Sequence, residues 1–309
     1  MQNFFDLLPQ TLVNGLTLGA VYGLIALGYS MVYGILKLLN FAHGDIYMLG
    51  AYMGFGALTL ASSPEGLLLP SALVVLGMLV VAMAGAGLAS IAVERFAYRP
   101  LRYAPRIAPL ISALGVSFIL QNLVQITVSP RPLSYGSGTL IPADASLLIG
   151  EQSIHYSRVL IVVITLTLML GLAYFVTRTR LGRAMRAVSM DLDAAQMMGV
   201  NVNQVILVTF MIGGMLAGAA GVLVGIVFFS IRHTMGFLAG LKGFTAAVVG
   251  GIGSIPGAAV GGLILGLVES FASVYISVTF KDAIAFLLLV AILLIRPTGL
   301  FGKPIVQKV

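Results

Sequence analysis

The chain has 309 residues, of which 59% are hydrophobic and only 9% are charged. An ordinary soluble domain carries about 25% charged residues, so a soluble protein of this composition could not cover its surface with polar groups. A lipid bilayer is therefore expected to surround most of the chain. The absence of cysteine excludes disulfides, a thiolate nucleophile and cysteine-based zinc sites.

The formal net charge of +7 raises the question of a nucleic-acid partner, and the positions of the arginines argue against one. Both arginine groups lie in short polar segments between long apolar runs, as the positive-inside rule predicts for cytoplasmic loops. We therefore expect a membrane protein with no nucleic-acid partner. The two groups are Arg95, Arg99, Arg102 and Arg106, and Arg178, Arg180, Arg183 and Arg186.

Stretches without a charged residue predict the membrane-spanning helices, because about 20 apolar residues in a helix cross the hydrocarbon core. They predict an all-α, polytopic transmembrane bundle of about eight spanning helices. The stretch 194–231 is too long for one helix and must include part of a loop. Those at 46–64 and 244–268 can be broken or re-entrant segments. The eight stretches are residues 7–36, 46–64, 66–93, 107–130, 159–177, 194–231, 244–268 and 283–295.

The arginine groups also predict the direction of the helices. With both groups in the cytoplasm, the helix from residue 107 runs outward and the helix from residue 159 runs inward. The loop 131–158 is then exterior, and the tail 296–309 is cytoplasmic. The first apolar run has no basic residues before it, so we expect a retained helix rather than a cleaved signal peptide. The sequence leaves open on which side of the membrane this first helix begins.

Two glycine-rich segments form a weak internal repeat. Residues 15–34 lead into a polar segment at 40–45, and residues 213–225 lead into 236–251, where Lys242 lies in an apolar setting. Interrupted hydrophobic segments in both halves of a chain are typical of transporters with a pathway between the halves. Glycine is also common in membrane helices generally, so both interpretations remain open.

Motifs for enzymatic chemistry are absent from the sequence. It contains no G-x-x-x-x-G-K-[ST] phosphate-binding loop, no H-E-x-x-H zinc motif and no G-x-S-x-G nucleophile elbow. The chain is therefore predicted not to be an enzyme and not to hydrolyse ATP itself.

Four polar residues are candidates for a substrate pathway. Asn40, His43 and Asp45 lie between two apolar runs, where Asp45 is predicted to be the N-cap of the following helix. Free N–H groups at such a helix end could face a substrate carboxylate; alternatively, these residues only lock the hairpin. Glu269 could be an interior charge paired with Lys242 or Lys281, or it could mark the water interface.

The segment 178–203 is predicted to contain an amphipathic cytoplasmic helix that ends at Gly199. Its apolar face could lie on lipid or dock into a groove of a partner. Glu94, next to Arg95, is expected at the cytoplasmic boundary in a local ion pair. The apolar positions at helical spacing are Met185, Val188, Leu192, Ala195 and Met198.

Several blocks spread along almost the whole chain resemble LivH-type permeases of bacterial branched-chain amino acid ABC importers. One of them is Asn-Phe-Ala-His-Gly at residues 40–44, and another is Arg-Pro-Thr-Gly-Leu-Phe-Gly at the tail. The full set comprises residues 15–34, 40–44, 91–100, 244–258 and 296–302.

This resemblance implies a single permease domain over residues 1–309 that carries leucine, isoleucine and valine across the inner membrane. It implies a second, LivM-like permease, two cytoplasmic ATPases and a periplasmic substrate-binding protein as partners. ATP and Mg²⁺ would bind to the ATPases, with no cofactor on this chain. It further implies that the segment around 178–203 couples to an ATPase groove through Arg186, Asp191, Asp193, Ala194, Ala195, Met198 and Gly199.

Two alternatives remain beside this interpretation. A urea or amide permease of an ABC importer shares much of the same sequence pattern. A passive channel or membrane scaffold would need neither nucleotide nor ATPase partners. Assays of substrate transport distinguish the first alternative from a branched-chain amino acid importer. The dependence of transport on ATP distinguishes the second.

Overall fold

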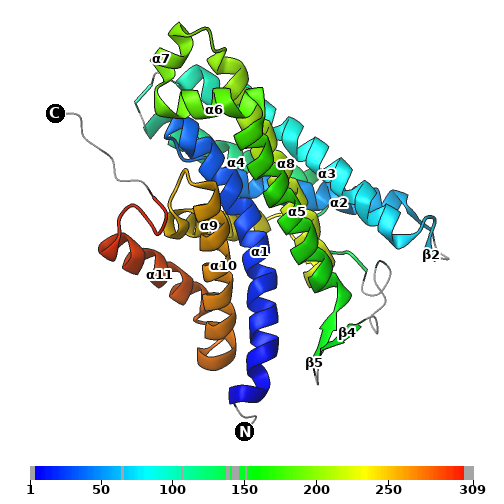
Figure 1. The fold of residues 1–309 in the computed structure, drawn as a ribbon. Helices are drawn as coiled ribbons and strands as arrows, with labels where there is room; N and C mark the ends of the chain where they lie inside the picture. Colours follow the sequence, from blue (N-terminus) through cyan, green and yellow to red (C-terminus); the bar gives the residue numbers. More distant parts are fainter. Residues whose placement is uncertain are drawn as a thin grey trace.

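The computed structural model describes residues 4–63, 66–102, 104–105, 107–136, 140, 146–149 and 152–302, and helices dominate these ranges (Figure 1). The predicted all-α class is confirmed. Arg106, Lys303 and Lys308 lie outside the described residues. The helices are α1 (Phe4–Leu36), α2 (His43–Leu60), α3 (Ser71–Val93), α4 (Ile107–Thr127), α5 (Tyr156–Arg178), α6 (Arg180–Met190), α7 (Leu192–Met197), α8 (Val202–Phe228), α9 (Met235–Gly250), α10 (Ile255–Phe271) and α11 (Lys281–Ile295).

Short elements connect or extend these helices. A π-helical turn, Glu94–Tyr98, continues α3, and a second one, Ala272–Ile276, continues α10; a 3₁₀ turn covers Arg99–Leu101. Three antiparallel strand pairs join loop segments. They are β1 (Ser62–Ser63) with β2 (Gly66–Leu67), β3 (Leu133–Ser134) with β6 (Ser230–Ile231), and β4 (Ser146–Ile149) with β5 (Gln152–His155).

Six helices in the described ranges are long and apolar enough to cross a membrane: α1, α3 with its extension, α4, α5, α8, and α10 with its extension. Helices α2, α9 and α11 have only 18, 16 and 15 residues. The multi-pass helical bundle is therefore confirmed. The predicted number of about eight spans is approximate, because three helices are shorter than the about 20 residues of a usual crossing.

The apolar stretch 244–268 contains the end of one helix and the start of another. Helix α9 ends at Gly250 and α10 begins at Ile255. Gly251 and Gly253 adopt φ angles of +107° and +89°, which glycine tolerates best, and the Ser254 hydroxyl accepts a hydrogen bond from the Gly257 N–H at 3.2 Å. The stretch 244–268 is therefore broken, as the sequence analysis allowed, but the absence of charge could not indicate where the break lies.

The two halves of the chain repeat the same order of elements. Helices α1, α2, α3 and α4 correspond to α8, α9, α10 and α11, and a π-helical turn follows both α3 and α10. The sequence Val-Glu-x-Phe-Ala occurs at both junctions, at residues 93–97 and 268–272. The repeat predicted from the glycine-rich segments is therefore present in the fold.

The repeat is inverted, because α1 and α8 run in opposite directions (Figure 1). The last residue of α1, Leu36, lines the same cavity as Val202 and Asn203, the first residues of α8. Gly28 and Gly213 meet along the two helices. Inverted repeats of this kind are a frequent basis of alternating access in transporters.

The halves are interlocked by close helix packing. Helix α1 packs against α9 and α10 of the second half, whereas α8 packs against α2 and α3 of the first half. Small residues allow these backbones to approach closely; a Cβ atom at Gly19 of α1 would lie only 2.7 Å from the Cα atom of Leu263 in α10. Neither half therefore has a core of its own.

Replacing Gly19 with alanine is expected to destabilise the protein by about 1–3 kcal/mol, the usual cost of overpacking, because its Cβ would press against the backbone of α10. Gly77→Ala is the matched control, since a Cβ atom at Gly77 has no atom within 4 Å. Thermal unfolding of both variants in detergent measures the difference. Equal melting temperatures would contradict the close approach of α1 and α10.

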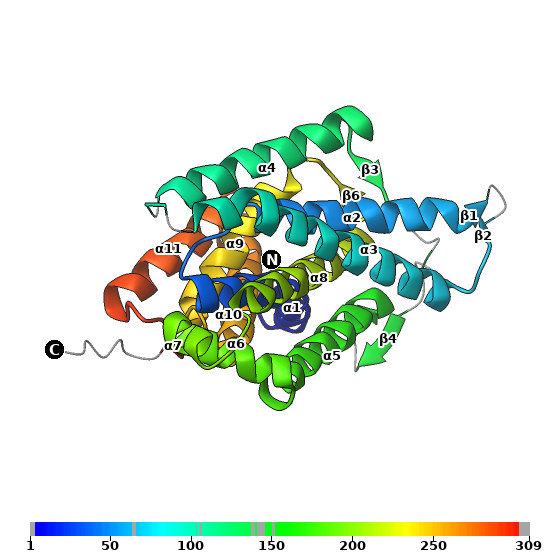
Figure 2. The same cartoon turned by 90° about the horizontal axis from the view of Figure 1, so that it is seen from above.

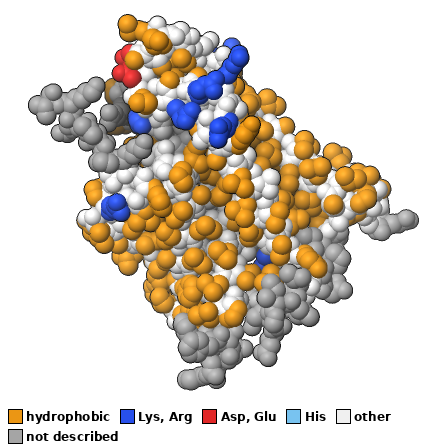
Figure 3. All heavy atoms as spheres, in the orientation of Figure 1, with side chains coloured by type: hydrophobic (Ala, Val, Ile, Leu, Met, Phe, Trp, Pro, Cys, Tyr) orange, Lys and Arg blue, Asp and Glu red, His pale blue; other side chains and the backbone are white. Residues whose placement is uncertain are grey.

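The outer helices expose apolar side chains. Viewed from above, α1 and α8 lie near the centre, and α4 and α5 lie on opposite flanks (Figure 2). The central apolar windows of α4 and α5 are 22% buried, compared with 83% for α1. Hydrophobic side chains cover much of the face shown in Figure 3, and most of the visible Lys and Arg side chains gather at the end that carries α6. Lipid or a partner helix is the natural environment of such flanks.

Candidate functional site

Two short helices, α6 and α7, project at one end of the molecule (Figure 1). The single amphipathic helix predicted here is divided at Asp191, whose side chain accepts a hydrogen bond from the Ala194 N–H at 2.9 Å and caps α7. The Thr179 hydroxyl caps α6 in the same way, through the Gly182 N–H at 3.0 Å. Gly199, with φ of +82°, follows the end of α7, as predicted.

Helices α6 and α7 pack one face against the helical bundle and expose the opposite face to the surroundings. Met185, Val188 and Ala195 are buried, so they hold the helices against the bundle. Met190, Met197 and Met198 are 88%, 87% and 84% exposed. These three exposed apolar side chains, here called the methionine surface, lie at the end of α6 and at the end of α7. Methionine side chains are flexible and adapt to irregular surfaces.

The residues predicted to couple to an ATPase fall into an exposed group and a buried one. Arg186, Asp191, Asp193, Ala194, Met198 and Gly199 are exposed, whereas Ala195 is buried and faces the protein. The Arg186 guanidinium donates to the Thr177 carbonyl oxygen at 3.3 Å. Met190 and Met197 were not among the predicted residues; their exposure depends on the turn at Asp191, which the helical periodicity did not reveal.

Arg102 connects the end of α3 to the start of α8. Its guanidinium forms an ion pair with the buried Glu94 and donates a hydrogen bond to the Asn203 side-chain oxygen at 2.6 Å. Asn201 caps α8, accepting from the Gln204 N–H at 3.1 Å. The predicted local ion pair of Glu94 is therefore present, with Arg102 as its partner. Through Asn203, this pair contacts the start of α8, which follows the segment that carries the methionine surface.

Asn40, His43 and Asp45 are all buried where α2 begins. The Asp45 carboxylate accepts hydrogen bonds from the Ser117 hydroxyl and, at 3.0 Å, from the Gln121 amide of α4. The His43 ring packs edge-on against Tyr29, with centroids 4.7 Å apart. The Tyr98 hydroxyl lies 3.3 Å from the Asn40 side-chain oxygen and donates to the Leu39 carbonyl at 2.9 Å.

The predicted role of Asp45 as an N-cap is wrong. Ala42 occupies the cap position with a helical backbone, and Asp45 is the third residue of α2. Its carboxylate instead lies where the first turns of α2 and α9 touch; a Cβ atom at Gly236 would lie 2.6 Å from Asp45 Oδ1. The N-termini of α2 and α9 therefore both lie near the Asp45 carboxylate, and a helix N-terminus favours a negative charge. Among the described residues, no lysine or arginine pairs with Asp45.

Glu269 lies in a charge cluster formed by Lys242, Glu269, Lys281 and Asp282, of which Lys242 and Glu269 are buried. The Lys242 ammonium is 2.7 Å from Glu269 and 2.6 Å from Asp282, and Lys281 is 3.9 Å from Glu269. The Tyr22 hydroxyl donates to the second Glu269 oxygen at 2.8 Å. Glu269 is therefore an interior charge, and both predicted lysine partners are present.

The charge cluster connects three elements of the second half with α1 of the first half. Lys242 and Glu269 are only 4% and 2% exposed, whereas the side chains of Lys281 and Asp282 are each 37% exposed. The cluster thus reaches the surface beside α11. The repeated Val-Glu-x-Phe-Ala sequence was the signal that could have identified Glu94 and Glu269 as equivalent positions, each buried and paired with a basic side chain.

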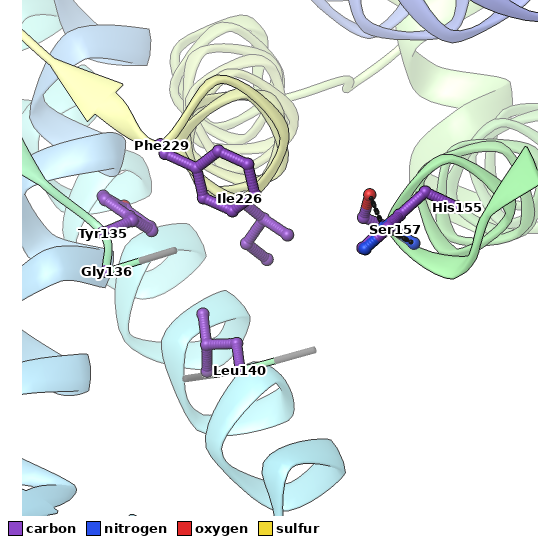
Figure 4. Close-up of a pocket in the computed structure, with 7 residues that line it drawn as sticks. All are labelled: Tyr135, Gly136, Leu140, His155, Ser157, Ile226 and Phe229. Atoms are coloured by element: carbon purple, nitrogen blue, oxygen red, sulfur yellow. Dashed lines mark hydrogen bonds between the residues drawn. The ribbon is translucent and has the colours of Figure 1, made fainter. Parts of the chain in front are cut away.

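The pocket in Figure 4 is too small for a solute. It lies among Tyr135, Leu140, His155, Ile226 and Phe229, and its volume is about 10 Å³, enough for about one water molecule. The Tyr135 hydroxyl donates to the Ala51 carbonyl oxygen and closes this region against α2. Within the described residues, no group of three or more His, Asp or Glu side chains is arranged to hold a metal ion.

Comparison with known proteins agrees with this architecture. Residues 11–293 match the family described as "Branched-chain amino acid transport system / permease component". The chain is 46% identical over 305 residues to the high-affinity branched-chain amino acid transport system permease protein BraD of Pseudomonas aeruginosa, covering 97% of both chains. It is 44% identical to LivH of Escherichia coli K12, again over 97% of both chains.

A more distant relative is the probable branched-chain amino acid transport permease protein LivH of Methanocaldococcus jannaschii, 30% identical over 90% of this chain and 88% of its own. The match thus spans both halves of the inverted repeat and includes α6 and α7. The chain belongs to the family of branched-chain amino acid transport system permease components.

Proposed function

We propose that this chain is a permease subunit of an ATP-binding cassette importer that carries leucine, isoleucine and valine across the bacterial inner membrane. The observation that supports this most strongly is the 44–46% identity over 97% of the chain to permeases named for high-affinity branched-chain amino acid transport. The apolar flanks and the inverted repeat suit a subunit that forms half of a membrane pathway.

The arginines of α6 favour a cytoplasmic position for this end of the molecule. Helix α1 begins at the opposite end, so we infer a periplasmic N-terminus (Figure 1). The segment after α11 returns to the end of α9, where the Phe301 N–H donates to the Gly250 carbonyl at 2.9 Å. Gly253, just beyond, lies beside Gly34 near the inferred cytoplasmic end of α1. These contacts support the proposal that the C-terminal tail lies on the cytoplasmic side.

The methionine surface is the proposed contact with a cytoplasmic ATPase. An apolar patch on short helices that protrude from a basic surface fits a groove better than a flat lipid face, since Asp191 and Asp193 lie beside it. Two such ATPases would bind ATP and Mg²⁺. A LivM-like second permease would cover one apolar flank, and a periplasmic binding protein would deliver the substrate.

The proposed substrate pathway passes the place where α2 and α9 meet. Asn40, His43 and Asp45 lie at this contact between the two repeats, and Glu269 anchors α10 to α1 on the other side of α9. We propose that these residues hold the repeats in register while the two permeases rock between outward-facing and inward-facing states. Substrate affinity can reside mainly in the soluble binding protein.

Transport by the complete importer tests the proposal. Proteoliposomes with both permeases, both ATPases and the binding protein should accumulate labelled leucine, isoleucine and valine only when ATP is supplied. Labelled urea should not accumulate. Uptake of urea with no uptake of leucine would replace the proposed substrate class, and ATP-independent flux would indicate a passive channel.

A further inference from the structure

The π-helical turn at the end of α3 contacts two distant parts of the chain. This turn, Glu94–Tyr98, is closed by a hydrogen bond from the Arg99 N–H to the Glu94 carbonyl oxygen. Glu94 and Tyr98 are only 1% and 0% exposed, and they lie at its two ends. Turns of this type are rare and often occur at functional sites. The π turn is therefore a candidate for more than a simple connection to α4.

Helix α8 holds one side of the π turn at two places. The Arg102 guanidinium forms an ion pair with Glu94 and donates to the Asn203 side-chain oxygen at 2.6 Å. Seven residues farther along α8, the Phe210 ring packs against Tyr98, with ring centroids 5.3 Å apart. Residues seven apart share one face of a helix. A movement of the start of α8 would therefore carry the π turn with it.

The start of α8 is in turn joined closely to the methionine surface. Only residues 198–201 separate α7 from α8. This connection is hydrogen-bonded, because the Val200 N–H donates to the Ala195 carbonyl oxygen at 3.0 Å and the Asn201 side chain caps α8. A displacement of α7 by a bound partner would therefore reach α8 through a short, ordered segment.

The other side of the π turn holds the segment before α2. The Tyr98 hydroxyl donates to the Leu39 carbonyl oxygen at 2.9 Å and lies 3.3 Å from the Asn40 side-chain oxygen. The first turn of α2 follows directly and touches α9 of the second repeat, where a Cβ atom at Gly44 would lie 2.8 Å from the Gly240 Cα atom. A shift of the π turn would therefore change the contact between the two repeats.

The polar network around the π turn is incompletely paired. Among the described residues, Asn40 Nδ2 and Arg102 Nε are buried and have no hydrogen-bond partner. A buried donor without a partner is costly, and a buried network makes a structure rigid only when all of its members are satisfied. These two donors are thus available for new hydrogen bonds in a second arrangement of the same elements.

We propose that Tyr98 and Arg102 are positioning residues that transmit ATP-driven movement of the methionine surface to the start of α2. The route runs from α7 to α8, through Arg102 and the π turn, and from the Tyr98 hydroxyl to residues 39–40. This inference rests on the proposed function, because it requires an ATPase at the methionine surface. Without the route, α7 and α8 could move while α2 stays in place, and ATP would be hydrolysed without transport.

The test measures the number of leucine molecules transported per ATP hydrolysed by the complete importer in proteoliposomes. Tyr98→Phe removes the hydroxyl and keeps the ring that packs against Phe210; it is expected to lower this ratio about tenfold, the effect of losing one buried hydrogen bond. Tyr52→Phe is the matched control, because Tyr52 is 7% exposed and its hydroxyl has no hydrogen-bond partner in the described part of the chain. Its ratio should stay that of the unaltered importer.

The ratio also separates transmission from a merely structural role. If the Tyr98 hydroxyl only stabilised the fold, Tyr98→Phe would reduce the amount of active importer, so transport and ATP hydrolysis would fall together. An unchanged ratio in Tyr98→Phe therefore overturns the proposal. Failure of the unaltered importer to transport leucine with ATP would instead reject the proposed function, whereas normal transport with an unchanged ratio in the variant rejects this inference alone.

Asn203→Ala tests the other end of the route. Asn203 is exposed, so losing its hydrogen bond with Arg102 is expected to lower the ratio by only about threefold. Asn122→Ala is the control, because the Asn122 amide donates within its own helix, to the Phe118 carbonyl. The double variant with Tyr98→Phe should remain near tenfold, because both changes break the same route. A product of the two effects, near thirtyfold, would show independent roles and overturn the proposal.

Discussion

Replacing Lys242 with methionine is expected to lower the free energy of unfolding by about 3–5 kcal/mol, the usual effect of breaking a buried ion pair. Lys242 is 4% exposed and lies 2.7 Å from Glu269 and 2.6 Å from Asp282. Its loss would leave the Glu269 carboxylate buried, with Lys281 only at 3.9 Å. Unfolding in detergent, followed by loss of helical circular dichroism, measures the change.

Two further variants separate the ion pair from a simple loss of packing. Lys281→Met should change stability by less than about 1 kcal/mol, because this lysine is more exposed and farther from Glu269. Adding Glu269→Gln to Lys242→Met should restore part of the lost stability, because the unpaired charge is then gone. If Lys242→Met alone is as stable as the unaltered protein, the charge cluster does not hold α9 and α10 together.

The charge cluster also indicates how far the sequence could predict this site. Glu269 was a candidate because it follows a long uncharged stretch, and its two possible lysine partners followed from the scarcity of charge in the membrane. Asp282 and Tyr22 were not predicted. Tyr22 lies 247 residues before Glu269, and only the packing of α1 against α10 brings the two together.

For the fold as well, the sequence predicted features that depend on neighbouring residues, and it did not predict features that depend on contacts between distant parts of the chain or on backbone angles. Hydrophobic stretches predicted the long helices closely, for example residues 159–177 for α5 and 107–130 for α4. A break within the stretch 244–268 was among the predictions, but its position at residues 251–254 was not, because it depends on backbone angles of glycine, which leave no mark on hydropathy. Asp45 was misplaced as a cap because α2 begins two residues earlier, where its first turn meets α9.

Replacing Met197 with aspartate is expected to weaken the association of this permease with its ATPase subunits by about 30-fold or more, the effect of losing a central apolar contact. Met197 is 87% exposed at the end of α7, so the substitution changes the methionine surface without disturbing the interior. Co-purification of the ATPases with the permease, titrated against salt and detergent, measures the association.

Met197→Leu is the matched control, because it keeps an apolar side chain of similar size and should retain the ATPases. The melting temperature of both variants should equal that of the unaltered permease, since the side chain has few contacts within this chain. The same pair of variants decides between docking and adsorption to lipid, the two roles left open for an amphipathic segment here. If the segment lay on the bilayer instead, the aspartate variant would keep its ATPases, and the methionine surface would then have no part in coupling.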